Sequence, residues 1–235
     1  MNKYGWADAA VNVMPYIVRI ELPDNYGSGF VINYRQDGKK RMVAIATAFH
    51  VIEHADKWGE LIRVIRGDTV VVLSPSEREI YGFEDRDLAL LVFDADGLKL
   101  PKKILQLGME KVLPPGFPVG WCGFPNIAEQ HECFFAGHIS TAFPVQGDYL
   151  LDGVTIHGIS GGPAFINLDN KITIIGVVSA YYPNRATGES LPGMSLIRSV
   201  EPFIEFFKKM NKKRQERGGK AREQKARKAS RKNVK

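Results

Sequence analysis

The sequence has few cysteines and no long apolar run. Cys122 and Cys133 are the only cysteines among 235 residues, too few for the disulfide framework of small secreted domains. No segment approaches the roughly 20 apolar residues that a membrane-spanning helix needs. Buried free thiols are the favoured interpretation of both cysteines, although a disulfide stays open if their strands are neighbours.

The N-terminus also lacks the pattern of a secretory signal. The apolar stretch from Ala9 to Ile20 is interrupted by Asn12, Pro15 and Arg19, so it holds no continuous apolar segment of the kind that export signals carry. Together with the low cysteine content, this predicts a cytoplasmic protein.

Acidic residues are scarce at the C-terminal end. From Lys208 to Lys235 there are 14 Lys and Arg against Glu216 and Glu223, while the rest of the chain carries 18 basic and 24 acidic residues. The tail has two open interpretations: a solvated tail, or an electrostatic anchor for nucleic acid or another polyanion. No aromatic residue follows Phe207, so base stacking has no support.

Long amphipathic helix patterns are rare before residue 199. Short segments rich in Val, Ile and Phe recur between Gly, Pro, Asn and Asp, which predicts an all-β barrel or sandwich. The Lys- and Pro-rich stretch from Leu98 to Gly116 reads as a connection between two halves. A helix is expected from Val200 to about Arg217, with disorder beyond Gly218 because that part has nothing to bury.

The strongest chemical signal is the segment from Gly158 to Pro163 (GISGGP). A nucleophile for acyl transfer must sit on a tight turn that exposes its oxygen and directs backbone N–H groups at the developing oxyanion. Glycines on both sides of Ser160 allow that geometry. A purely structural turn before a strand is the alternative.

Two further segments supply partners for Ser160. His50 follows an apolar strand, and histidine is the residue type best suited to act as a general base that activates a hydroxyl near neutral pH. Asp87 opens a buried strand, where a carboxylate needs a partner, and orienting the imidazole would provide one. Asp85 competes for this role, but Asp87 directly begins the apolar strand and is preferred. The order His, Asp, Ser, each at a strand edge, makes coincidence improbable.

With these residues in place, the sequence resembles the trypsin-like serine proteases with the chymotrypsin fold, especially short bacterial and HtrA-like members. The matching segments are Gly27–Ile32, Thr47–His50, Asp87–Leu91, Gly137–Ser140, Gly158–Pro163 and Gly176–Ser179. The resemblance implies a protease domain over residues 1–207, with two antiparallel six-stranded β-barrels at about 10–97 and 112–198 and the active site between them. Residues 208–235 would follow as the basic helix end and tail.

The resemblance also assigns site residues. It implies a Ser160–His50–Asp87 triad and an oxyanion hole formed by the N–H groups of Gly158 and Ser160. The strand containing Ser179, Ala180 and Tyr181 would pair with the substrate backbone. Val154 and Tyr181 would shape the specificity pocket, with His157 at its rim, and the expected preference is for small or medium apolar residues.

Some family features are absent. Ile159 stands where cleavage-activated proteases carry an aspartate, and no cleavage sequence of the Ile-Val-Gly-Gly type is recognisable, so activity without zymogen cleavage is expected. No PDZ-like domain follows the barrels. Neither His54 nor the set Cys122, His131, Cys133 and His138 has the spacing of a metal site, so no metal or cofactor is implied. The rival hypotheses are a catalytically silent peptide-binding module and a scaffold whose functional part is the tail.

Overall fold

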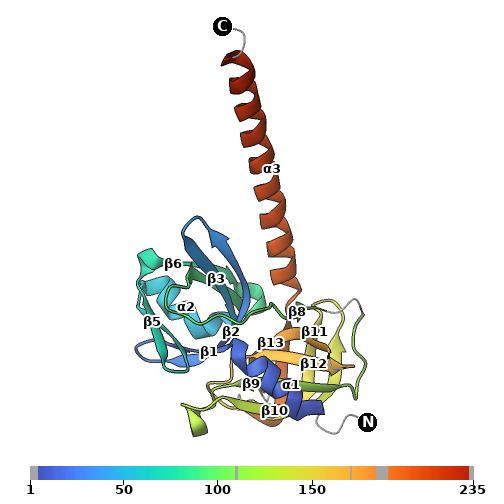
Figure 1. Ribbon diagram of the computed structural model, residues 1–235. Helices are drawn as coiled ribbons and strands as arrows, with labels where there is room; N and C mark the ends of the chain where they lie inside the picture. Colours follow the sequence, from blue (N-terminus) through green and yellow to red (C-terminus); the bar gives the residue numbers. More distant parts are fainter. Residues whose placement is uncertain (1–4, 109–110, 170, 184–189, 233–235) are drawn as a thin grey trace. The chain divides into compact units, whose positions relative to one another are not determined.

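The computed structural model describes residues 5–108, 111–169, 171–183 and 190–232 (Figure 1). Residues up to Val200 form one compact unit, and the helix from Glu201 onward forms a second. The first unit consists of two curled sheets, antiparallel except for the parallel pairing of β8 with β13, which confirms the predicted all-β class. Among the described residues no helix is both long and apolar enough to cross a membrane.

The N-terminal sheet contains seven strands in the order β5-β4-β1-β2-β3-β7-β6. Their bounds are β1 Ile17–Glu21, β2 Tyr26–Asp37, β3 Lys40–Thr47, β4 Ile62–Arg66, β5 Thr69–Leu73, β6 Arg78–Phe83 and β7 Leu88–Asp94. The two edge strands, β5 and β6, are consecutive in the chain and are joined through the 3-10 helix η2 (Pro75–Glu77). This half is therefore a curled sheet whose two edges are linked by a short turn, whereas six strands in a barrel were predicted.

The C-terminal sheet has the order β12-β9-β10-β11-β14-β13-β8, and an additional β12–β13 pairing closes six of these strands into a barrel. The strands are β8 Gln106–Leu107, β9 Pro118–Gly123, β10 Cys133–Phe143, β11 Asp148–Asp152, β12 Pro163–Leu168, β13 Lys171–Pro183 and β14 Ser190–Ser199. Its core surrounds the fully buried Trp121 and includes Ile159, Leu151 and Val178. The predicted six-stranded barrel is present here.

Short helices precede β1 and connect some of the later strands. The helices are α1 Gly5–Val13 and α2 Phe49–Trp58, and the remaining 3-10 turns are η1 Met14–Tyr16, η3 Glu84–Arg86 and η4 Asn126–Ala128. Helix α2 buries Phe49, Val51 and Ile52 on one face and ends at Gly59 in the left-handed region, where glycine has no side-chain penalty. This helix follows β3 immediately, so its first turn lies at the end of a buried strand.

The C-terminal helix α3 runs from Glu201 to Lys232. The sequence predicted an end near Arg217 and disorder beyond Gly218, so the helix is longer than expected. Most residues after Arg217 are Ala, Gln, Glu, Lys and Arg, whose high helix propensities offset the cost of the two glycines. The prediction of disorder beyond Gly218 considered only the lack of apolar residues to bury, and it neglected helix propensity.

Candidate active site

His50 and Asp87 form a hydrogen-bonded pair in the N-terminal half. His50 is the second residue of α2, and Asp87 lies between η3 and β7. The Nδ1 atom of His50 lies 2.9 Å from Oδ2 of Asp87 and 3.0 Å from Oδ1. The backbone N–H of His50 also donates to Oδ1, at 3.0 Å. Because these contacts engage Nδ1, the other ring nitrogen, Nε2, remains available to accept a proton.

The carboxylate of Asp87 has a further donor, the hydroxyl of Ser179 on β13. Burial alone would raise the pKa of Asp87, but the hydrogen bond and charge of His50, followed by the hydrogen bonds from Ser179 and the His50 amide, lower it below its ordinary value. Asp87 is therefore ionised near neutral pH and can stabilise a protonated imidazole beside it.

Ser160 lies on a turn that only glycines permit. Gly158 and Gly161 have φ angles of +92° and +90°, a region that L side chains rarely adopt. A Cβ atom on Gly158 would overlap the carbonyl oxygen of Phe124, and one on Gly161 would overlap the carbonyl oxygen of Ser28. The hydroxyl of Ser160 donates to the carbonyl of Ser179 at 2.9 Å, so it must rotate away from that acceptor to reach His50.

The carbonyls that precede Gly158 and Ser160 are both held by hydrogen bonds. The N–H of Asn126 donates to the carbonyl of His157 at 2.8 Å, and the N–H of Gly162 donates to the carbonyl of Ile159 at 2.9 Å. In a trans peptide the N–H points opposite to the C=O, so both N–H groups are turned away from these partners. Across the described part of the chain, neither N–H has an acceptor.

Ile159, between these two groups, is fully buried in the core of the C-terminal barrel. Its side chain therefore anchors the turn by apolar packing at a position where a carboxylate would have required a charged partner. The turn is held from the N-terminal half as well. The N–H of Ser28 donates to the carbonyl of Ser160 at 2.8 Å, and the Ser28 hydroxyl donates to the carbonyl of Gly158 at 2.7 Å.

Ser28 is a residue whose role the sequence did not reveal. Its hydroxyl also accepts from the N–H of Phe124, at 2.9 Å, and Thr47 donates to its carbonyl at 2.7 Å. Ser28 is fully buried on β2. Within the segment Gly27-Ser28-Gly29, the only signal was a small polar residue between glycines in an otherwise apolar strand.

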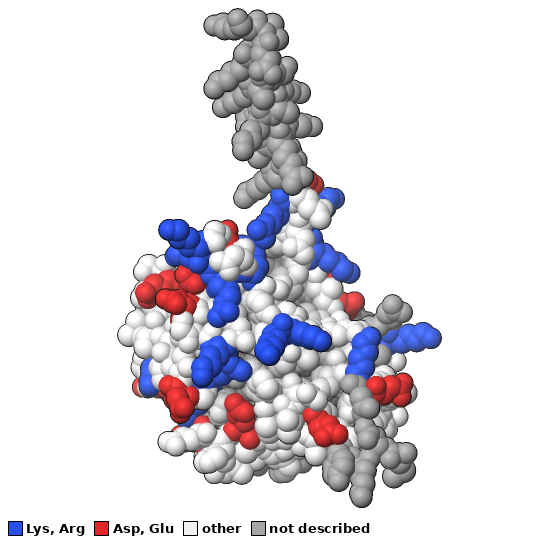
Figure 2. Space-filling view, in the orientation of Figure 1, with Lys and Arg blue, Asp and Glu red and all other residues white. Residues whose placement is uncertain are grey.

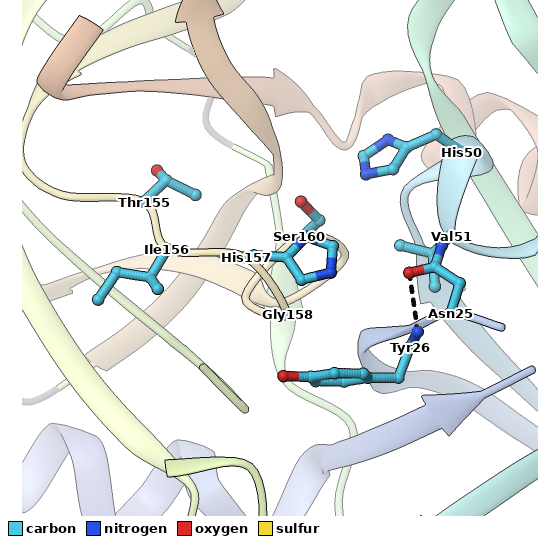
Figure 3. A pocket seen from close by; sticks show the side chains of 9 residues that line it. All are labelled: Asn25, Tyr26, His50, Val51, Thr155, Ile156, His157, Gly158 and Ser160. Atoms are coloured by element: carbon cyan, nitrogen blue, oxygen red, sulfur yellow. Dashed lines mark hydrogen bonds between the residues drawn. The ribbon is translucent and has the colours of Figure 1, made fainter. Parts of the chain in front are cut away.

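His50 and Ser160 line the same cavity, of about 270 Å³ (Figure 3). The other lining residues are Asn25, Tyr26, Val51, Thr155, Ile156, His157 and Gly158. The imidazole of His157 meets the ring of Tyr26 edge-on, with centroids 5.8 Å apart. One side of the cavity therefore comes from the N-terminal half and the other from the loop that leads to Ser160.

Of the predicted substrate-binding residues, some line the cavity and others do not. His157 lines the cavity, whereas Val154 does not belong to its lining and is 50% exposed; Thr155 and Ile156 line it instead. Ser179 is buried beneath Asp87 and Ser160. The backbones of Ala180 and Tyr181 belong to β13, but their side chains lie outside the described residues.

The two cysteines are free. Cys122 pairs with Phe134 and Cys133 pairs with Gly123. Because directly paired residues share a face and neighbours alternate, the two thiols project to opposite faces of the sheet. Burial, with smaller contributions from Glu132 and Cys133, raises the pKa of Cys122 to about 12. This arrangement does not favour the disulfide that the sequence left open.

His54 and Asp85, the other candidates in the sequence, lie outside the proposed triad. His54 contacts Glu60, with Nδ1 2.9 Å from Oε2, and Asp85 is exposed. Within the described ranges, no group of three or more His, Cys, Asp or Glu residues is arranged to hold a metal ion.

Comparison with known proteins identifies the class. The trypsin-like peptidase domain family matches residues 27–177, while no curated protein sequence matches the chain. The fold is similar to a solved serine endoprotease from Yersinia pestis (18% identity, TM-score 0.63, covering 87% of this chain and 65% of that one). It is also similar to Deg5 (22%, 0.62, 87% and 93%).

A third similar structure is an inactive serine-to-alanine mutant of Rv3671c from M. tuberculosis H37Rv (19% identity, TM-score 0.60, covering 86% of this chain and 89% of that one). At these identities the likeness concerns the fold. The family match, however, covers more than half of the chain, so the protein belongs to the trypsin-like peptidase family. Its structural neighbours are serine proteases.

Proposed function

We propose that the protein is a serine endopeptidase that hydrolyses peptide bonds through an acyl-enzyme. The proposal is supported above all by one observation. His50, which is hydrogen-bonded to Asp87, and Ser160 line a common cavity, and the two N–H groups flanking Ile159 have no acceptor within the described residues. Acyl transfer needs a base, a hydroxyl and donors for the oxyanion in one place.

In the first half of the reaction, the Ser160 hydroxyl rotates from the Ser179 carbonyl toward Nε2 of His50. As Ser160 Oγ bonds to the substrate carbonyl carbon, its proton moves to Nε2, and Asp87 stabilises the resulting imidazolium. The N–H groups of Gly158 and Ser160 donate to the negatively charged oxygen. The tetrahedral intermediate then expels the amine, which takes the proton from Nε2, and the acyl-enzyme remains.

In the second half, water gives a proton to His50 as its oxygen attacks the acyl carbon. Collapse of this intermediate returns the proton to Ser160 and releases the carboxylic acid. The step needs no metal or organic cofactor. The carbonyls of His157 and Ile159 are held away from the proposed oxyanion site before substrate arrives, and Ile159 packs in the core. These contacts support activity without zymogen cleavage.

We propose that the cleaved position prefers small or medium apolar residues. The loop leading to Ser160 presents Thr155 and Ile156 to the cavity, and neither provides a charge for Lys, Arg or Glu side chains. His157 and Tyr26 would contact the substrate at the rim. A cleavage profile of a peptide library tests this: dominance of Lys, Arg or Glu at the cleaved position would contradict it.

Labelling with a fluorophosphonate probe tests the catalytic proposal. The wild type should become covalently labelled at Ser160, whereas Ser160→Ala should not be labelled. Ser140→Ala, at an exposed serine on β10, is the matched control and should label like the wild type. His50→Ala should label much more slowly, because the hydroxyl has lost its base. A folded wild type that takes no label would instead favour the catalytically silent binding module.

A second function is proposed for α3: binding of duplex nucleic acid through its phosphates. On the face shown in Figure 2, Lys and Arg mix with Asp and Glu over the first unit, whereas the helical segment from Lys208 is strongly basic. After Met210 its only apolar residues up to Lys232 are alanines, so it lacks the apolar face that membrane-surface helices use. It also lacks aromatic residues for stacking on single strands, which leaves phosphate contacts along a duplex.

Fluorescence anisotropy with a labelled DNA duplex and an RNA duplex tests the second function. Affinity should fall steeply with salt, by about 10³-fold between 50 and 200 mM if six or more phosphates are contacted. The triple variant K212Q/K213Q/R214Q should weaken binding, while K99Q/K102Q/K103Q removes the same charge from exposed residues of the first unit and should not. Binding that is absent, or insensitive to salt, would eliminate this function.

A further inference from the structure

The two halves of the first unit share a partly buried ion pair beside the proposed triad. Nη2 of Arg86, the residue before Asp87, lies 2.6 Å from Oδ1 of Asp148 on β11. The same nitrogen donates to the carbonyl of Gln146 at 2.6 Å. The side chain of Asp148 is only 2% exposed. The loop that carries Asp87 is thereby connected directly to the barrel that carries Ser160.

The Asp148 carboxylate is fully engaged from its own barrel as well. Arg198 donates to Oδ2 at 2.9 Å, and the N–H of Ser199 donates to Oδ1 at 2.9 Å. Two hydrogen bonds from β14 therefore fix the Asp148 carboxylate, and Arg86 binds to a group that is already held in place by the C-terminal barrel. Burying such charges costs desolvation energy that roughly offsets their attraction, so a buried ion pair is weak evidence for stability. The position of the Arg86–Asp148 ion pair, between the Asp87 loop and the C-terminal barrel, is a better guide to its role than its contribution to stability.

The backbone at Asp87 needs outside support. Asp87 has φ +48° and ψ +46°, in the left-handed region, which non-glycine residues occupy only when the surroundings hold them there. One side of this residue is held by His50 and Ser179. Arg86 is the adjacent anchor, and it is the one that reaches the other half through a side-chain ion pair.

We propose that Arg86 and Asp148 are positioning residues that set Asp87, and through it His50, against Ser160. They touch neither the substrate nor the reacting atoms. His50 and Asp87 belong to one half and Ser160 to the other. The distance between base and nucleophile therefore depends on the position of one half relative to the other. A displacement of about 1 Å between reacting groups can cost about 10²-fold in rate. The inference rests on the proposed peptidase function.

The test compares Arg86→Gln with Arg198→Gln. Both substitutions remove one arginine contact from Asp148, but only the first removes the ion pair that joins the Asp87 loop to the C-terminal barrel. Arg86→Gln should lower kcat by about 10²-fold with little change in KM, and Arg198→Gln should stay close to the wild type. Arg86→Lys should recover much of the activity, because an ammonium can still pair with Asp148. Equal losses in the two Gln variants, or full activity of Arg86→Gln, would overturn the proposal.

A second measurement separates this inference from the proposed function. The proton on Nδ1 of His50, shared with Asp87, gives a downfield resonance in proton NMR that reports their geometry without turnover. The resonance should shift or broaden in Arg86→Gln and persist in Arg198→Gln, even if the wild type cleaves no peptide. If Arg86→Gln does not fold, Asp148→Asn takes its place, because it also removes the ion pair. An unchanged resonance and an unchanged kcat in whichever of these two variants folds would refute the positioning role.

Discussion

Replacing Ser28 by alanine should damage both stability and catalysis. The change removes one oxygen and leaves the carbonyl of Gly158 and the N–H of Phe124 without their partner. Ser28 itself is completely buried, so water cannot easily replace the hydroxyl. Each buried group left unsatisfied costs about 1–3 kcal/mol, so the free energy of unfolding should fall by about 2–6 kcal/mol.

The catalytic effect follows from the same contact. The Ser28 hydroxyl restrains the carbonyl of Gly158, one of the two residues whose N–H groups are proposed to stabilise the oxyanion. Losing an oxyanion donor costs about 10²–10³-fold in kcat. A residue that only restrains the donor should cost less, about 10-fold or more, mainly in kcat.

Urea denaturation and steady-state kinetics on a peptide substrate measure the two effects. Ser140→Ala is the control for loss of an exposed serine hydroxyl. Thr47→Val should be intermediate, because Thr47 donates only to the carbonyl of Ser28, at 2.7 Å. If Ser28→Ala were as stable as the wild type, the Gly158 carbonyl and the Phe124 N–H would not depend on the Ser28 hydroxyl, and the predicted loss of stability would be refuted. If it were less stable but had an unchanged kcat, the restraint of Gly158 would be irrelevant to the reaction.

Three further predictions concern other residues. Ile159→Asp would bury an unpaired carboxylate in the core, so it should unfold at much lower urea than Ile159→Val, which should cost about 0.5–1.5 kcal/mol; equal midpoints would contradict this. The lowered pKa of Asp87 means that its contribution to stability is present above its unfolded pKa, near the ordinary value of 3.8, and is lost as the pH falls through its folded pKa. Urea midpoints should therefore fall below about pH 4, and less so in Asp87→Asn; parallel profiles would refute the assignment. Cys122 is buried and its pKa is raised to about 12, so Ellman's reagent should modify at most Cys133 in the native protein and both thiols in urea; two reactive native thiols would disprove the burial.

The fold was largely predictable because its signals are local. Short apolar segments between turn residues indicated strands, and the glycines around Ser160 marked a turn whose φ angles only glycine adopts easily. His50 and Asp87 each stood at the edge of an apolar strand, and the structure places them in hydrogen-bond contact. The position of each residue along its own strand was enough to nominate it.

The supporting contacts were not predictable because they join distant parts of the chain. Ser28 and Gly158 are separated by 130 positions, and Arg86 and Asp148 by 62. No period or local motif encodes which buried side chain meets which carbonyl across two sheets. The resemblance assigned Val154 to the specificity pocket, but it could not give the direction of the side chain, because Val154 lies on a loop where side-chain directions follow no regular alternation.

The hydrogen bonds from Ser28 have a consequence for how the molecule becomes reactive. The turn that carries Ser160 belongs to the C-terminal barrel, yet β2 of the N-terminal half supplies two of the hydrogen bonds that shape it. A nascent chain, or a molecule cut between β7 and β9, would hold a nucleophile without its supporting hydrogen bonds and a base without its target. Peptidase activity should thus appear in a single step, when the two halves dock. Chains that are still folding would not cleave neighbouring polypeptides.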